Sequence, residues 1–185
     1  VTFQVSGGTY DDTRETFPLK IIAAPGVNAT NTVTFKPVPG ANVYLTTTSA
    51  NPIVEMNTAD YFTFDGSNVV NGTTRNFKMY SAGGGPAIKL INGATYNTFK
   101  NLYLLGNSAS SAGGIINIAN SNSTYGIGNS YNVIAANTIG DSAALIRSYT
   151  AIYAYGDYSY PNTANRIDGN YIINMGTLNG YGYGI

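Results

Sequence analysis

The feature that most constrains how this chain can fold is an internal repeat of about thirty-five residues. Residues 53–66, IVEMNTADYFTFDG, align without a gap with residues 88–101, IKLINGATYNTFKN, and six of the fourteen positions are identical. The same offset carries Tyr61 to Tyr96 and Tyr96 to Tyr131. Self-similarity at a fixed period in this range is typical of solenoids, in which each repeat is one structural unit stacked on the next.

The repeat unit consists of short alternating runs and shows no helical period. Its runs are rich in Ile, Val, Phe, Tyr and Thr, which is typical of strands. In one unit the candidate strands are residues 87–91 (AIKLI), 97–101 (NTFKN) and 102–107 (LYLLGN). We expect Asn or Gly at the corners between strands, where a left-handed backbone is tolerated. The pattern predicts an all-β solenoid of about five coils with three strands per coil.

The repeat organises the chain as one unit, and residues 1–185 are expected to form a single β-helix segment. Regular coils are predicted over residues 52–185, and a less regular first coil over 1–51. Because the chain begins at Val1 and closes on GYGYGI, which matches the start of another coil, we expect it to be an excerpt of a longer chain. Longer insertions are expected to leave one side of the rod as loops, at 67–76, 107–114, 120–130 and 156–164.

Stacked coils place equivalent residues about 4.8 Å apart, so equivalent side chains should form files along the rod. Tyr61, Tyr96 and Tyr131 are expected to stack, and Asp65 is expected to lie beside Lys100. An asparagine file should satisfy backbone groups at one corner through side-chain amides. The predicted asparagine file is Asn97, Asn132 and Asn165, and the predicted inward apolar file is Phe64, Phe99, Ile134 and Ile167.

The composition excludes several classes of partner and chemistry. Only 10% of residues are charged, against roughly 25% in typical soluble domains, and nine basic residues balance nine acidic ones. Without a cluster of Lys and Arg, nucleic acid is not an expected partner. The chain contains no Cys and no His, so we expect no disulfide, no metal site and no cofactor. No apolar run reaches the roughly 18 residues of a membrane span, and none is predicted.

A recurring pattern, Asn-x-apolar-x-x-Asn-x-apolar, occurs as NVIAANTI at 132–139 and as NRIDGNYI at 165–172. It resembles the parallel β-helix repeat of the pectin-lyase-like superfamily, and the resemblance covers about residues 52–185. It implies that the coils are right-handed. It implies little about activity, because that superfamily includes lyases, hydrolases, phage tailspikes and adhesins.

A narrower resemblance lies in the first half of the chain, in GGTYDDTRETFPLKI, NATNTVTFKPVPG and ADYFTFDGSN. This succession is similar to secreted and surface proteins of the Bacteroidota that carry a type IX secretion sorting domain. The resemblance implies an extracellular or cell-surface location and a sorting domain beyond Ile185. Asp141, Ser142 and Ala143 also resemble an O-glycosylation site of that group, which makes Ser142 a candidate for modification.

Enzymatic activity is not the preferred interpretation, although it stays open. Lyases of the superfamily resemble one another in using clustered aspartates for calcium and an Arg or Lys as base, and its hydrolases use neighbouring carboxylates. Here Arg166 and Asp168 share one strand face, and Asp141 and Asp157 are expected in turns. No trio of stacked carboxylates is visible, so no catalytic residue is assigned. The alternative function is a non-catalytic part of a polysaccharide lyase or glycoside hydrolase.

Tyrosine-rich segments are the best candidates for binding. Residues 148–161, SYTAIYAYGDYSYP, contain five tyrosines around one aspartate. A tyrosine ring offers an apolar face to a sugar and a hydroxyl for hydrogen bonds, although tyrosine is also simply a good strand residue. The candidate glycan-binding residues are Tyr153, Tyr155, Asp157, Tyr158 and Tyr160.

The preferred interpretation is a structural or assembly role, because such a role does not depend on any particular site residue. An open end of a β-helix presents unpaired backbone groups, so it should continue into further coils of the parent chain or meet another protein. We therefore expect an extracellular structural or adhesive module that also contacts polysaccharide.

Overall fold

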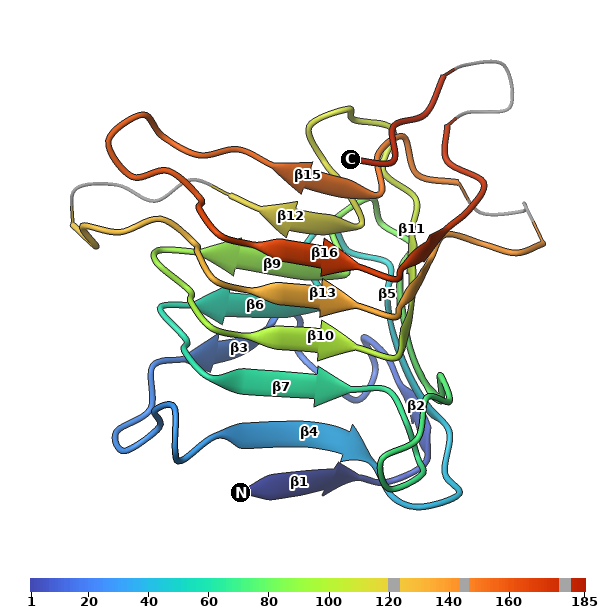
Figure 1. Cartoon of the computed structure of the whole chain (residues 1–185). Helices are drawn as coiled ribbons and strands as arrows, with labels where there is room; N and C mark the ends of the chain where they lie inside the picture. The colour runs from blue at the N-terminus through green and yellow to red at the C-terminus, as the bar shows by residue number, and fades with distance from the viewer. Residues whose placement is uncertain (120–123, 144–146, 177–180) are drawn as a thin grey trace.

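The computed structural model describes residues 1–119, 124–143, 147–176 and 181–185. These residues form a right-handed parallel β-helix with 17 strands and no helix, which confirms the predicted fold class. In Figure 1 the chain runs along the front of the rod, returns along the back, and climbs one coil with each circuit. Five complete coils are followed by two strands of a sixth.

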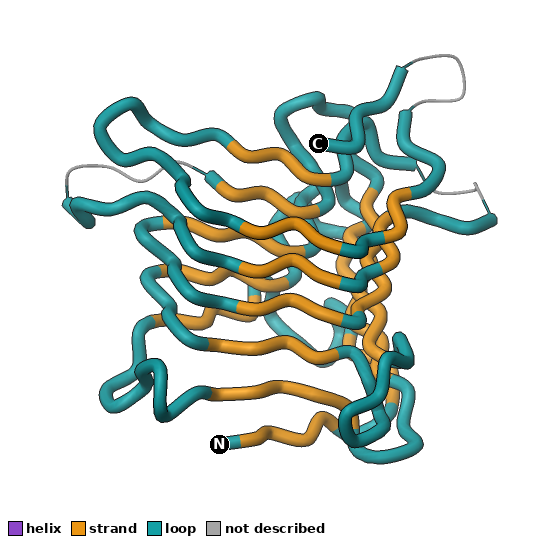
Figure 2. Tube along the Cα trace, in the orientation of Figure 1, coloured by secondary structure: helices purple, strands orange, loops and turns teal. Residues whose placement is uncertain are grey.

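Every coil contributes one strand to each of three parallel sheets, which wrap a shared interior (Figure 2). Sheet A contains β1 (Thr2–Val5), β4 (Val33–Pro37), β7 (Phe62–Asp65), β10 (Thr98–Lys100), β13 (Val133–Ala135) and β16 (Arg166–Asp168). Sheet B contains β2 (Gly8–Tyr10), β5 (Val43–Thr47), β8 (Phe77–Ser81), β11 (Leu102–Gly106), β14 (Thr138–Ile139) and β17 (Tyr171–Ile172). Sheet C contains β3 (Leu19–Ile22), β6 (Val54–Asn57), β9 (Ile88–Ile91), β12 (Ile116–Ile118) and β15 (Ile152–Ala154).

The interior is built from files of apolar side chains, as the repeat predicts. In sheet A, Phe99 pairs in register with Phe64 on one side and Ile134 on the other, and Ile134 pairs with Ile167. Phe99 is fully buried, and its ring stacks on that of Phe64 with centroids 5.8 Å apart. Because strand side chains alternate between faces, this register keeps the apolar file inside in every coil. The file continues below the regular repeats through Phe35 and Phe3.

The predicted asparagine ladder is present at the corner before sheet A. The side-chain amide of Asn97 donates to Oδ1 of Asn132, and that of Asn132 donates to Oδ1 of Asn165, each at 3.1 Å. Asn97 and Asn132 have no exposed surface, so these bonds satisfy amide and backbone groups that water cannot reach. A second ladder, which the sequence analysis did not single out, joins Asn137 to Asn170 at 3.0 Å at the corner before sheet B.

The left-handed backbone falls partly where it was expected. Asn92 and Asn101, which follow β9 and β10, adopt it with φ values of 60° and 55°, whereas at the ladder corners the residue before the asparagine adopts it instead. Tyr96 and Tyr131 have φ values of 55° and 60°, directly before Asn97 and Asn132. The asparagine is thereby turned inward, where its amide joins the ladder.

The expectation that loops leave one side of the rod is wrong. Residues 66–76 join sheet A to sheet B, residues 107–115 join sheet B to sheet C, and residues 155–165 join sheet C to sheet A. Each loop projects from the corner between the two sheets that it joins. The length of an insertion in the sequence does not show which corner that is. In the remaining predicted insertion, at 120–130, residues 120–123 lie outside the described residues.

Outward-facing charges on sheet A pair across coils. Asp65 and Lys100 lie in register, and the Lys100 ammonium lies 3.3 Å from the Asp65 carboxylate. The predicted pair is therefore formed. The Lys100 side chain is 43% exposed and that of Asp65 is 11% exposed, so solvent screens the pair from the lysine side and its contribution to stability is of the order of 0–1 kcal/mol.

Asp12 fastens the first coil to the second. Its carboxylate accepts hydrogen bonds from the Thr47 hydroxyl at 2.6 Å and from the Thr48 amide at 2.7 Å. The hydrogen bond from Thr47, followed by those from Thr48, lowers the pKa of Asp12. A carboxyl with a lowered folded-state pKa adds stability above its unfolded pKa and loses it as the pH falls through the folded value.

Asp12→Asn is therefore expected to make the free energy of unfolding differ less between neutral and acidic pH. The asparagine keeps the size of the side chain but has no charge to lose below about pH 4. The measurement is the urea midpoint of wild type and variant at about pH 7 and about pH 2.5. Asp12→Asn should lower the midpoint at neutral pH and leave it nearly unchanged in acid. An equal shift at both pH values would contradict the assignment.

Candidate functional site

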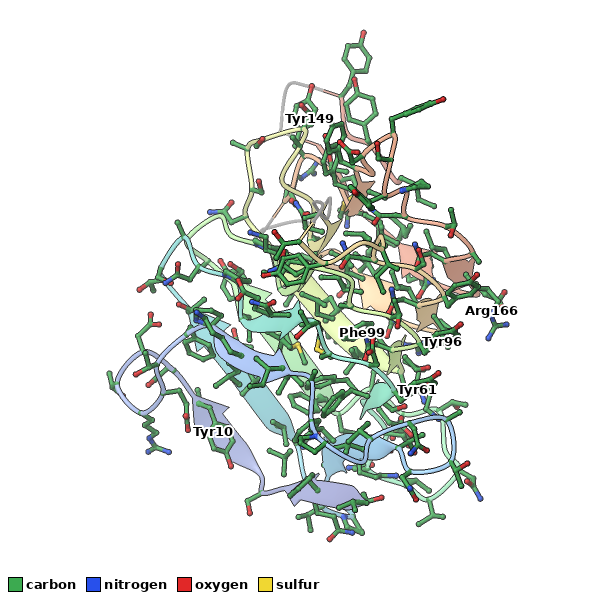
Figure 3. All side chains as sticks on the ribbon, turned by 90° about the vertical axis from the view of Figure 1, so that its left-hand side faces the viewer. Tyr10, Tyr61, Tyr96, Phe99, Tyr149 and Arg166 are labelled. Carbon is green, nitrogen blue, oxygen red and sulfur yellow. The ribbon has the colours of Figure 1, made fainter. Side chains whose placement is uncertain are left out.

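A stack of three tyrosine rings, here called the tyrosine ladder, runs along the corner where sheet C passes into sheet A. Its members are Tyr61, Tyr96 and Tyr131, from successive coils. Neighbouring ring centroids lie 4.9 and 4.8 Å apart with planes 4° from parallel. Figure 3 faces this corner and shows Tyr61 directly below Tyr96. The predicted tyrosine stack is thus present, and it lies on the surface.

Backbone geometry fixes the ladder in register. All three tyrosines adopt the left-handed conformation, which directs their side chains outward at the corner. The amide of Tyr96 donates to the Ser130 carbonyl at 3.2 Å, and the amide of Tyr131 donates to the Thr163 carbonyl at 3.0 Å. Tyr96 and Tyr131 nevertheless keep 44% and 48% of their surface exposed. The ladder therefore presents ring edges and hydroxyls to the outside.

The hydroxyl of Tyr96, the central rung of the ladder, remains protonated over the physiological pH range. Desolvation, followed by the neighbouring Tyr131 and Tyr61, raises the pKa of Tyr96 above its usual value. An unperturbed tyrosine already titrates near pH 10. The Tyr96 hydroxyl is consequently neutral and can both donate and accept hydrogen bonds.

A file of oxygen-bearing side chains accompanies the ladder, one residue before each ring. Thr95 donates its amide to the Asp60 carboxylate at 2.8 Å, and Thr163 donates its amide to the Ser130 hydroxyl at 2.9 Å. Asp60, Thr95, Ser130 and Thr163 thus follow one another up the corner. This file was not recognised in the sequence, although Asp60, Thr95 and Ser130 recur at the same offset as the tyrosines they precede.

The upper part of this corner encloses a surface depression of about 380 Å³, here called the corner hollow. Rings of Tyr96, Tyr131 and Tyr160 line it, and Ile127 adds a further apolar side chain that is 52% exposed. The hydroxyl-bearing residues Thr95, Ser130, Ser159 and Thr163 also line it, and Gly126, Gly128 and Pro161 complete the lining. No charged side chain lines the hollow. Apolar rings and convergent hydroxyls without charge are the features of a site for a neutral polyhydroxylated ligand.

Asn162 holds the segment that forms the upper wall of the hollow. Its amide donates to the carbonyls of Ala119 and Tyr155 at 3.1 and 3.0 Å, while its Oδ1 accepts from the Asn129 amide at 2.8 Å. Asp157 closes the adjoining turn by accepting from the Ser159 amide at 2.9 Å. The loop carrying Tyr160 is thereby tied to the coil beneath it.

The predicted glycan-binding cluster is divided between three places. Tyr160 lines the corner hollow, and Asp157 serves the turn just described. Tyr153 and Tyr155 line a separate shallow depression of about 270 Å³ on sheet C, together with Lys89 and Asn117. Tyr158 is fully exposed and lines neither depression. The structure therefore brings Tyr160 together with Tyr96 and Tyr131, and not with its neighbours in sequence.

Ser142, the candidate modification site, is exposed. Its hydroxyl lies 3.2 Å from the hydroxyl of Tyr103, and its amide donates to the same oxygen at 3.3 Å. Asp141, next to it, accepts from the Ala143 amide at 3.1 Å through its carboxylate. The candidate serine therefore lies at the surface, against a tyrosine of sheet B.

The charged residues considered for catalysis form a simple surface pair. Arg166 and Asp168 interact at 3.1 Å, and both side chains are more than half exposed (Figure 3). In the described ranges, no group of three Asp or Glu residues is arranged to hold a metal ion. The same part of the chain contains no helix long and apolar enough to cross a membrane.

Comparison with known proteins finds no relative of this chain. Scans against models of protein families, curated proteins and solved structures each find no match. The three-sheet solenoid and its corner hollow are therefore the basis on which function is argued.

Proposed function

We propose that this chain is an extracellular structural and adhesive β-helix module that contacts neutral glycans through the corner hollow. The observation that carries the proposal is the convergence of three tyrosine rings and four hydroxyl side chains on an uncharged depression. Sugars present apolar C–H faces and hydroxyl edges, and this lining complements both. Within the same proposal, the fold belongs to the pectin-lyase-like type and the location is that of Bacteroidota surface proteins exported by type IX secretion.

The rigidity of the scaffold supports an adhesive role. The hollow is built on stacked coils whose corners are held by buried amide ladders and by a register of backbone hydrogen bonds. A preorganised site loses little conformational entropy when it binds, so even a small contact area can be useful. Repeated surfaces along a longer rod would add avidity to individually weak contacts.

The composition supports a role at an assembly surface. Positive and negative charges balance, and side chains with hydroxyl and amide groups are abundant in the sequence. Weak electrostatic repulsion favours close approach to other neutral surfaces. We propose that polysaccharide is one partner and that further coils or another protein meet the open ends.

Tyr160→Ala is expected to weaken glycan binding by about tenfold, because truncating an aromatic contact at a binding site typically costs more than 1 kcal/mol. Binding would be measured by isothermal calorimetry or nuclear magnetic resonance titration against neutral glucan, xylan, mannan and galactan oligosaccharides.

Tyr158→Ala is the matched control. Tyr158 lies in the same loop, is fully exposed and lines neither of the two depressions described above, so its removal should leave the affinity unchanged. Equal weakening by both variants would assign the effect to the loop in general. Unchanged affinity in Tyr160→Ala would refute the hollow as the glycan site. Release of unsaturated sugars from acidic polysaccharide by the parent protein would instead support a lyase.

A further inference from the structure

The tyrosine ladder ends one rung before the coils do. The next residue up the corner file is Ala164, whose φ of 54° matches the 63°, 55° and 60° of the three ladder tyrosines. The Tyr131 amide donates to the carbonyl of Thr163 as the Tyr96 amide donates to that of Ser130, so Ala164 occupies the fourth rung position. This rung has the backbone of the ladder but no ring.

One face of the Tyr131 ring is consequently left without an aromatic partner. Its other face stacks on Tyr96 at 4.8 Å, and no further ring pairs with it among the described residues. Ala164 is exposed, and the corner hollow opens beside Tyr131, bounded by Tyr160, Pro161 and Thr163. Ala164 itself does not line the hollow, so the free ring face lies next to the hollow, on the side of the exposed Ala164.

The surroundings of this ring face decide what it can hold. The Ser130 hydroxyl accepts from the Thr163 amide at 2.9 Å and from the Thr163 hydroxyl at 3.3 Å, and it donates to the Pro161 carbonyl at 3.4 Å. Ser130 is thus fully engaged, while the oxygen of the exposed Thr163 hydroxyl keeps lone pairs that can accept from a ligand. Among the described residues, the lining contains no carboxylate that would attract a cation and no Lys or Arg that would hold an anion. A neutral ring with an apolar face and hydroxyls at its rim matches this environment.

We propose that the space over Ala164 is a stacking subsite, in which one neutral sugar ring lies on Tyr131 as the missing fourth rung of the ladder. The inference rests on the proposed function and specifies the subsite and its ligand class. The sugar face replaces the ring that Ala164 lacks, and its hydroxyls can donate to the exposed hydroxyl of Thr163. The tyrosine ladder would thus both stack along the corner of the fold and stack against the ligand.

Ala164→Tyr tests the subsite directly. Because Ala164 already has the ladder backbone, the new ring should stack on Tyr131 and occupy the space of the sugar. We expect the affinity for the neutral oligosaccharide that binds wild type to fall at least about tenfold. Thermal stability should be maintained or increased, because the new ring extends an existing stack.

Ala136→Tyr is the matched control. Ala136 has a φ of 55° and lies at the corner between sheets A and B, away from the hollow. This variant makes the same exchange in the same backbone conformation, and it should bind as wild type does. Tyr131→Leu supplies an independent variant should Ala164→Tyr fold poorly, and it should also lose at least about tenfold in affinity.

The outcomes separate this inference from the proposed function. If Tyr160→Ala weakens binding while Ala164→Tyr and Tyr131→Leu do not, the hollow binds glycan but the stacking subsite is wrong. If none of the three weakens binding, or if no neutral oligosaccharide binds wild type at millimolar concentration, both proposals fail. Preferential binding of tetramethylammonium or of a uronate oligosaccharide would overturn the assignment to a neutral sugar.

Discussion

Replacing Asn132 with alanine is expected to lower the free energy of unfolding by about 4 kcal/mol, because it removes the centre of a buried ladder. The Oδ1 atom of Asn132 accepts from the backbone amide of Asn97 at 3.0 Å. The side-chain amide of Asn132 donates to the Ala94 carbonyl at 3.0 Å. Both groups would be left without a partner in a region that water cannot reach. Each orphaned buried group costs roughly 1–3 kcal/mol, and the void left by the amide adds to that.

Urea denaturation followed by far-ultraviolet circular dichroism would measure this loss. Asn107→Ala is the control, because Asn107 is exposed and its side-chain amide donates to a single carbonyl at 3.4 Å. That exchange should change the stability by no more than about 0.5 kcal/mol. A loss of less than about 1 kcal/mol in Asn132→Ala would mean that water enters the corner and replaces the ladder.

Phe99→Ala is expected to cost a similar amount, about 4 kcal/mol, for a different reason. Phe99 is the fully buried centre of the apolar file and contacts ring and aliphatic side chains of the coils above and below. Its removal leaves a cavity that rigidly stacked coils cannot close. The same denaturation experiment measures the effect, since both changes act on one cooperative stack.

Phe3→Ala offers a comparison within the same file. Phe3 stacks on Phe35 at 5.4 Å, but it lies at the open end and is 52% exposed. The same exchange should therefore cost only about 1 kcal/mol, because little apolar surface is returned to water. Equal losses at Phe3 and Phe99 would contradict the idea that stability is concentrated in the central coils.

The files along the rod could be predicted because a β-helix converts sequence offset directly into spatial neighbourhood. Once residues 35 apart are known to be equivalent, Phe64 must lie beside Phe99, and Asn97 beside Asn132. The registers and the hydrogen bonds between these pairs confirm both expectations. The conformation at the corner was harder to assign, because Tyr and Asn are adjacent in sequence and only one of them turns inward.

The candidate site could be predicted only in part. The sequence drew attention to the tyrosines after position 148, and one of them, Tyr160, does line the corner hollow. Tyr153 and Tyr155 lie instead on a strand and its end in sheet C, where alternation and sheet position decide the direction of their side chains. Ile127 and Thr163 carried no signal, since they reach the hollow from loops of different coils.

The sequence by itself determined the architecture of this protein, because a repeated pattern of apolar, polar and corner residues has one way to bury its apolar files in every coil. Only the tertiary structure decided where a ligand could bind. The hollow depends on which corner each loop leaves and on how far the tyrosine ladder extends before Ala164 interrupts it. Both are relations between coils, and local sequence does not encode the distance between surfaces that the winding of the chain brings together.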